Sequence, residues 1–127
     1  MGKVKKLDSW SKWIDYKLIE LGRNVNAYSD EHSPLTLKTV TLAITLAEDL
    51  DYFNAPEPTE IFIDDFGSVV FQRDIKDKKV IASVLPNGSV EYLALGFPKG
   101  ARRKVVPRCK TGEKDYWSEW ILEAMGK

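Results

Sequence analysis

The residues with types and spacing that could do chemistry begin with carboxylates near the centre of the chain. Asp74, Ile75 and Lys76 form the D-x-K pattern found in many metal-dependent nucleases, and Asp64 and Asp65 lie upstream. We expect Asp64 beside a turn and Asp74 far along the next strand, about 20 Å away at roughly 3.4 Å per residue. Two carboxylates at that separation cannot share one Mg²⁺. A small metal-dependent nuclease is therefore the third choice of function.

Nucleophilic catalysis would require the single cysteine and the single histidine to meet. Cys109 and His32 stand in no recognisable motif. One cysteine excludes an internal disulfide, and one cysteine with one histidine excludes the common structural zinc sites. We therefore expect no catalytic residue, no cofactor and no metal site, and we expect stability to come from packing.

Basic residues gather in the last third of the chain. From residue 99 to residue 114 there are seven lysines and arginines against one acidic residue. Such a segment could grip a phosphate backbone, with nearby aromatic rings stacking on exposed bases. Nucleic-acid binding through segment 99–110 is the alternative function, and the residues named for contact there are Arg102, Arg103, Lys104 and Arg108.

Acidic residues gather elsewhere. From residue 30 to residue 65 there are nine acidic residues against Lys38 alone, although the net charge of the whole chain is zero. A neutral chain with separated charges is suited to polar association with a partner or with another copy of itself. A homodimer is therefore among the expected arrangements.

Three helices are predicted from the spacing of apolar residues. Asp8-Ser9 can cap the first, which Gly22 ends, and Ser33-Pro34 can begin a second that runs to about residue 53. A last helix is predicted over 115–124. Each terminal helix carries two tryptophans three residues apart, a spacing typical of a core stripe. These are Trp10, Trp13, Trp117 and Trp120.

The stretch from Thr59 to Leu95 predicts the sheet. Its short apolar runs are separated by turn signals at Asp65 to Gly67, at Asp77-Lys78 and at Asn87-Gly88, and such signals are typical of hairpins. The predicted fold is α+β: helix-helix-four-stranded antiparallel meander-helix, in one domain of residues 1–127. Residues 1–7 are expected to be flexible, and residues 96–114 to form a basic loop.

Hairpin arithmetic predicts the register and the two faces of this sheet. The three turns set Ile63 opposite Val69, Phe71 opposite Val84, and Val84 opposite Glu91. The core face then carries Ile61, Ile63, Val69, Phe71, Ile75, Val80, Ala82, Val84, Leu93 and Leu95. The outer face carries Phe62, Asp64, Val70, Gln72, Asp74, Ile81, Ser83, Leu85, Val90 and Tyr92. This outer face is apolar enough to be an interaction surface, unless the C-terminal segment folds over it.

The meander also resembles a family. Residues 67–73 and 80–92 are similar to a group of small prokaryotic and phage proteins with a helix, a proline linker and a sheet reading G-x-V-x-F-E-W … P-D-G-S-V-E-Y. The likeness covers Leu42 to Leu95, and Gln72-Arg73 stands where the group has Glu-Trp. It implies this fold and an accessory role in a prokaryotic or phage setting, and it brings no catalytic residue.

Together these patterns predict a non-enzymatic protein-binding module. Hydrophobic content of 43% and charged content of 30% are typical of a soluble globular protein. No apolar run approaches 18 residues, so we expect no membrane association and a cytoplasmic location. The expected role is that of an accessory, inhibitor or adaptor of a larger complex. The residues expected to bind the protein partner are Phe62, Gln72 and Tyr92 on the outer sheet face, with Arg102, Arg103, Lys104 and Arg108 in the basic segment.

Overall fold

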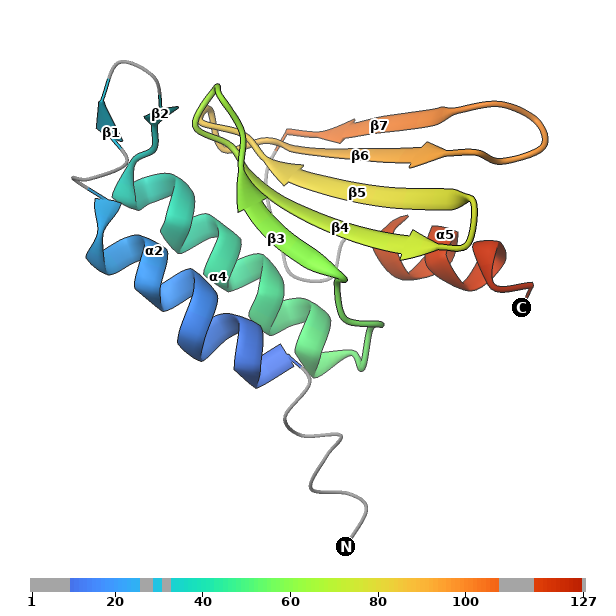
Figure 1. Cartoon of the computed structure of the whole chain (residues 1–127), viewed down its shortest axis with the longest axis horizontal. Coiled ribbons are helices and arrows are strands. Elements are labelled where there is room, and N and C mark those ends of the chain that lie inside the picture. The colour runs from blue at the N-terminus through green and yellow to red at the C-terminus, as the bar shows by residue number, and fades with distance from the viewer. Residues whose placement is uncertain (1–9, 26–28, 31–32, 108–115, 127) are drawn as a thin grey trace, which may run out of the picture.

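The protein has two layers, a five-stranded antiparallel sheet and helices that pack on one of its faces (Figure 1). The computed structural model describes residues 10–25, 29–30, 33–107 and 116–126. This arrangement confirms the α+β class in one domain. No helix among these residues is long and apolar enough to cross a membrane.

The first helical region starts at Trp10 and contains a π-helix, η1 (Trp13–Leu18), followed by α2 (Ile19–Arg23). Leu18 and Leu21 point into the core. The predicted end, with Gly22 just past the helix, is too early, because α2 runs through Gly22 to Arg23 and Asn24 caps it. The Asn24 side-chain amide donates to the Glu20 carbonyl at 2.8 Å. The predicted cap at Asp8-Ser9 lies outside the described residues.

The second long helix, α4 (Leu37–Tyr52), starts later than the sequence predicts. Ser33-Pro34 does not begin it but forms β2 (Ser33–Pro34), which pairs with β1 (Ser29–Asp30). Thr36 is the actual N-cap: its backbone is extended and its hydroxyl accepts the Thr39 amide at 3.2 Å. A threonine hydroxyl satisfies a free amide of the first turn, which explains why α4 begins directly after Thr36.

A short linker joins α4 to the sheet, and three tryptophan indoles hold it. Trp10 donates to the Ala55 carbonyl at 2.8 Å, and Trp117 donates to the Pro56 carbonyl at 2.8 Å. Trp13 donates to a Glu57 carboxylate oxygen at 3.1 Å. The prolines prevent the linker from forming regular structure, so Trp10 and Trp117 satisfy backbone carbonyls that a helix or strand would otherwise pair.

The sheet has five strands in the order β3-β4-β5-β6-β7. They are β3 (Glu60–Ile63), β4 (Val69–Ile75), β5 (Lys78–Val84), β6 (Val90–Leu95) and β7 (Arg102–Val106). The prediction of four strands followed by a basic loop over 96–114 is therefore wrong within that loop. Residues 102–106 pair with β6 and form the last edge strand. The chain ends in α5 (Tyr116–Ala124), close to the predicted bounds.

The register agrees with the prediction at the first hairpin and departs from it at the other two. Ile63 faces Val69 as predicted, whereas Phe71 faces Ala82. That second shift moves the partner by two residues and leaves the faces unchanged. At the third hairpin Val84 faces Val90, a shift of one residue, which exchanges the two faces of β6.

Tyr92 is consequently misplaced by the sequence prediction. It lies on the helix-covered face of β6 and is 5% exposed, as are Val90 at 1% and Ala94 at 0%. Leu93 and Leu95 occupy the opposite face, where the prediction had placed Tyr92. Tyr92 therefore belongs to the core and cannot serve as a surface contact.

The core lies between the sheet and the helices, with Phe71 near its centre. The Phe71 ring centre is 6.1 Å from that of Trp10 and 6.3 Å from that of Trp117. Both terminal helical regions therefore cover the same sheet face. The prediction that the tryptophans are core residues is confirmed for Trp10, Trp117 and Trp120, which are nearly fully buried, while Trp13 is partly buried.

Candidate protein-binding surface

The helices leave the other face of the sheet open. On the covered face Ile61, Val69, Phe71 and Val80 are buried to 1% or less. On the opposite, outer face most side chains are partly or well exposed, because no described helix packs over them. Figure 1 shows α2, α4 and α5 on one side of the strands.

Each strand contributes at least one apolar side chain to this outer face, and we call this set the outer stripe. Phe62 of β3 faces Val70 of β4, and Ile81 of β5 faces Leu93 of β6. The outer stripe ends at β7 with Val105, which faces Glu91 and is 44% exposed. Its members, with Leu95 at 37% exposure beside Leu93, are Phe62, Val70, Ile81, Leu93, Leu95 and Val105. Val70 is buried at 5% exposure, and the others are partly or well exposed.

Polar groups lie among and beside the members of the outer stripe. The Gln72 amide donates to Asp74 at 3.0 Å, and Arg103 donates to Glu91 at 2.5 Å. Non-obligate protein interfaces are likewise only about as apolar as the rest of a protein surface. Burying these side chains against a partner removes apolar surface from water. Each Å² removed stabilises the complex by about 25 cal/mol.

Two of the three predicted outer-face contacts lie where the sequence placed them. Phe62 and Gln72 are on the outer face, on neighbouring strands, and both are partly exposed. Tyr92 is the exception described above. The sequence does not predict contacts at Leu93, Leu95 and Val105. The predicted register exchanges the two faces of β6, and residues 102–106 carry no strand signal.

The predicted basic contacts are divided between the two faces of β7. Arg102 and Lys104 lie on the helix side, and Arg103 lies on the outer side. Arg102 forms a bidentate ion pair with Glu123 of α5, at 2.8 and 2.6 Å. These hydrogen bonds raise the pKa of the Arg102 guanidinium and hold the pKa of the Glu123 carboxyl below its ordinary value.

Aromatic rings engage the same cations. The Arg102 guanidinium lies 4.8 Å from the centre of the Phe97 ring, and the Lys104 ammonium lies 6.0 Å from the centre of the Tyr116 ring. Arg103 is bonded to Glu91, although its side chain is 65% exposed. Both arginines would have to leave or share a glutamate partner to bind a phosphate. Arg108 lies outside the described residues.

The residues considered for catalysis are not brought together. Asp74 pairs with Lys79 near one end of the β4–β5 hairpin, whereas Asp64 lies at the turn between β3 and β4. The Asp64 carboxylate accepts the amides of Phe66 and Ser68 at 3.0 and 2.9 Å. Across the part of the chain that is described, no three metal-ligating side chains cluster. Cys109 and His32 lie outside it.

Sequence reasoning also missed Phe66, at the tip of the first hairpin. This ring is 75% exposed, and the Asp64 carboxylate holds the turn that presents it. An aromatic residue inside a turn otherwise made of Asp and Gly was the available signal, because turns seldom need one.

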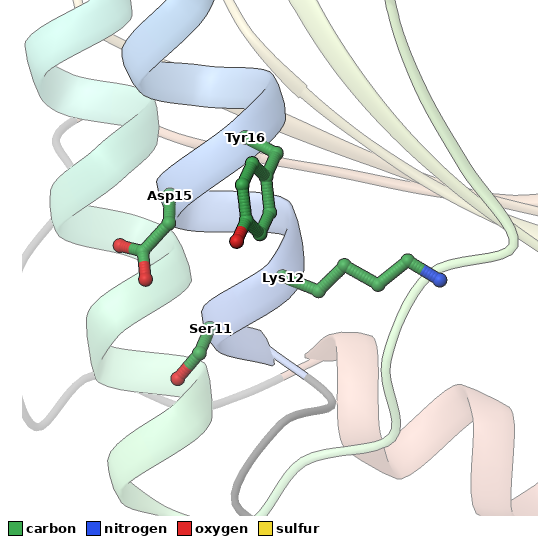
Figure 2. A pocket seen from close by; sticks show the side chains of 4 residues that line it. All are labelled: Ser11, Lys12, Asp15 and Tyr16. Carbon is green, nitrogen blue, oxygen red and sulfur yellow. The ribbon is translucent and has the colours of Figure 1, made fainter.

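A hollow of about 360 Å³ lies on the first helical region and is lined by Ser11, Lys12, Asp15 and Tyr16. Figure 2 shows that all four side chains project from the same helix. Ligand pockets usually enclose most of their ligand between several elements, and Tyr16 is 77% exposed. We therefore assign no ligand to this hollow.

Comparison of the chain with protein-family models, with curated proteins and with solved structures found no match.

Proposed function

We propose that this chain is a non-enzymatic protein-binding module that docks its partner on the outer stripe. The observation that carries the proposal is the one-sided arrangement of the fold. The described helices cover one sheet face, and the other carries exposed or partly exposed apolar side chains on β3, β5, β6 and β7. Exposed apolar surface gathered on one face is typical of protein-interaction sites.

A protein partner suits this surface better than a nucleic acid. When another apolar surface covers side chains such as Ile81, Leu93 and Val105, the free energy of the complex falls. A phosphate backbone instead requires several available cations, and two of the four at 99–106, Arg102 and Arg103, are already bonded to glutamates, which leaves Lys99 and Lys104.

The resemblance of the meander to small prokaryotic and phage proteins supports the setting. We place the chain in the cytoplasm as an accessory, inhibitor or adaptor of a larger complex. Phe62 and Gln72 would contact the partner from the β3 side of the outer stripe, and Val105 from the β7 side.

Affinity capture with matched aspartate variants tests the proposal. Leu95→Asp and Val105→Asp place a charge at exposed positions of the outer stripe. Leu37→Asp places the same charge at a 59% exposed leucine on α4, away from the sheet. The three variants and the unmodified chain are immobilised, exposed to prokaryotic lysate, and compared by quantitative mass spectrometry after far-UV circular dichroism has verified folding.

We expect one protein to be retained by the unmodified chain and by Leu37→Asp, and to fall about tenfold with either stripe variant, as a contact worth 1–2 kcal/mol would give. Equal retention by all four would contradict docking on the outer stripe. Retention of nuclease-sensitive nucleic acid, with no stripe-dependent protein, would favour the alternative function.

A further inference from the structure

The two edges of the sheet carry opposite charge. β3 and β7 are the terminal strands, and each has one side without a strand partner among the described residues. Residues 57–65, in and around β3, contain four acidic residues and no basic one: Glu57, Glu60, Asp64 and Asp65. Residues 99–106, in and around β7, contain four basic residues and no acidic one: Lys99, Arg102, Arg103 and Lys104.

Neighbouring elements neutralise these edges in part. Glu123 and Glu91 pair with Arg102 and Arg103, and Glu119 of α5 also acts electrostatically on Arg102. Lys99 and Lys104 are exposed and form no ion pair with any described residue. The basic edge therefore keeps an excess of positive charge.

The acidic edge also keeps its charge. Glu60 and Asp65 are exposed. The cation near this edge is Arg73, whose guanidinium donates to the Glu57 backbone carbonyl at 2.7 Å and forms no ion pair with a described carboxylate. The sheet therefore has a negative edge and a positive edge.

We infer that copies of this chain associate head to tail, with the β7 edge of one copy beside the β3 edge of the next. Unpaired edge strands are templates for pairing with another chain. Charge decides which edges meet, because like charges on facing strands repel and opposite charges attract. Two β7 edges repel each other, as do two β3 edges, so the unlike pair is the one that forms.

Strand direction is compatible with this arrangement. Each of the four pairings in the sheet is antiparallel, so β3 and β7, separated by an even number of steps, run in the same direction. A second copy placed beside the first therefore continues the sheet through a parallel pair, with helices on the same side. Val105 of one copy then lies near Phe62 of the next, so the outer stripes of the two copies adjoin.

Such an interface joins two different surfaces, so each copy keeps one unoccupied edge. Heterologous contacts of this kind produce rings when the rotation closes and open chains when it does not. Self-association depends on the edges and does not require that the outer stripe bind another protein.

Sedimentation velocity and light scattering of the full chain test the inference. In about 20 mM salt, where charges interact over more than 20 Å, we expect the weight-average mass to rise with protein concentration past twice the 14.5 kDa monomer. In about 1 M salt, where screening confines interactions to roughly 3 Å, we expect it to fall back toward the monomer.

Charge-reversal variants test which surfaces meet. Lys99→Glu with Lys104→Glu leaves two basic and two acidic residues at 99–106, and Glu60→Lys with Asp65→Lys leaves two of each sign at 57–65. Each double variant therefore removes the charge excess of one edge. We expect each double variant to be monomeric alone and an equimolar mixture to associate again. Lys12→Glu with Lys17→Glu changes the net charge as much as the first variant but at exposed helical positions, so we expect it to associate alone.

Three results would overturn the inference. The first is an unmodified chain that stays monomeric at every concentration in low salt. The second is a dimer that stops growing, because it indicates a symmetric interface. The third is a mixture of the two edge variants that does not associate although both remain folded by circular dichroism.

Discussion

Replacing Tyr92 with alanine tests which face of β6 packs under the helices. The Tyr92 side chain is 5% exposed, and its ring centre lies 5.7 Å from that of Tyr116 on α5. Truncation removes the ring and leaves a cavity between β6 and α5. Buried aromatic truncations cost about 3–5 kcal/mol in the free energy of unfolding, and we expect a loss of about 3–4 kcal/mol because Tyr116 can partly fill the space.

Urea titration followed by tryptophan fluorescence measures this loss directly. For a chain of this size about 1 kcal/mol corresponds to roughly 4 °C, so the melting temperature should fall by roughly 12–16 °C. Tyr92→Phe keeps the ring and should cost about 1 kcal/mol. Leu95→Ala, on the opposite face and 37% exposed, should cost roughly 0.5 kcal/mol.

The reverse order of losses would refute the reasoning. If Tyr92→Ala costs less than about 1 kcal/mol while Leu95→Ala costs more than about 2 kcal/mol, the exposed and buried faces of β6 are exchanged. The outer stripe would then contain Tyr92, and the original sequence prediction would be right.

The misplacement of Tyr92 has a local cause in the β5–β6 turn. Asn87-Gly88 predicts a two-residue loop, in which both residues need positive φ. In the structure the Gly88 amide donates to the Leu85 carbonyl at 2.9 Å, so the turn begins one residue earlier and Pro86 takes its second position. Proline favours that position because its φ is already near −65°. Only Gly88 then takes positive φ, at 93°.

The same three-residue loop was correctly predicted at the first hairpin. There the Gly67 amide donates to the Asp64 carbonyl, and Gly67 has a φ of 82°. Sequence reasoning thus succeeded where the turn lacked a proline and failed where Asn-Gly outweighed one. An error of one residue was enough to exchange the faces of β6, whereas the two-residue error at the β4–β5 turn changed no face.

Strand β7 could not be predicted from its own residues. The sequence Arg-Arg-Lys-Val-Val has no alternation of polar and apolar residues, which is the signal of a half-buried strand. Its structure depends on β6, whose second edge offers unpaired backbone groups to whatever segment follows. The same pairing with β6 places Arg102 and Arg103 on opposite faces of the sheet. The sequence alone therefore could not predict that each arginine has a different glutamate partner.

Three further predictions concern the contacts that hold the sheet and helices together. Trp117→Phe removes the indole that donates to the linker. It should lower the free energy of unfolding, measured by urea titration, by about 2–4 kcal/mol. A loss under about 1 kcal/mol would contradict the importance of this contact. Gly96→Ala should cost at least about 2 kcal/mol, because Gly96 has a φ of 84° and a Cβ there would lie 2.5 Å from a carbonyl oxygen of the β4–β5 turn. Gly100→Ala, with positive φ but open space around it, should cost less, and equal costs would contradict the steric reason. The last prediction concerns Glu123, whose pKa is lowered by its hydrogen bonds from Arg102. A lowered folded-state pKa means that the carboxylate stabilises the fold above its unfolded pKa, about 4.3, and that this contribution disappears as pH falls through the folded value. Glu123→Gln should therefore be less stable than the unmodified chain at pH 7, and the difference measured by thermal melts should shrink below about pH 4. A difference that stays constant from pH 7 to about pH 2 would show that the glutamine acts through packing and not through the lost charge.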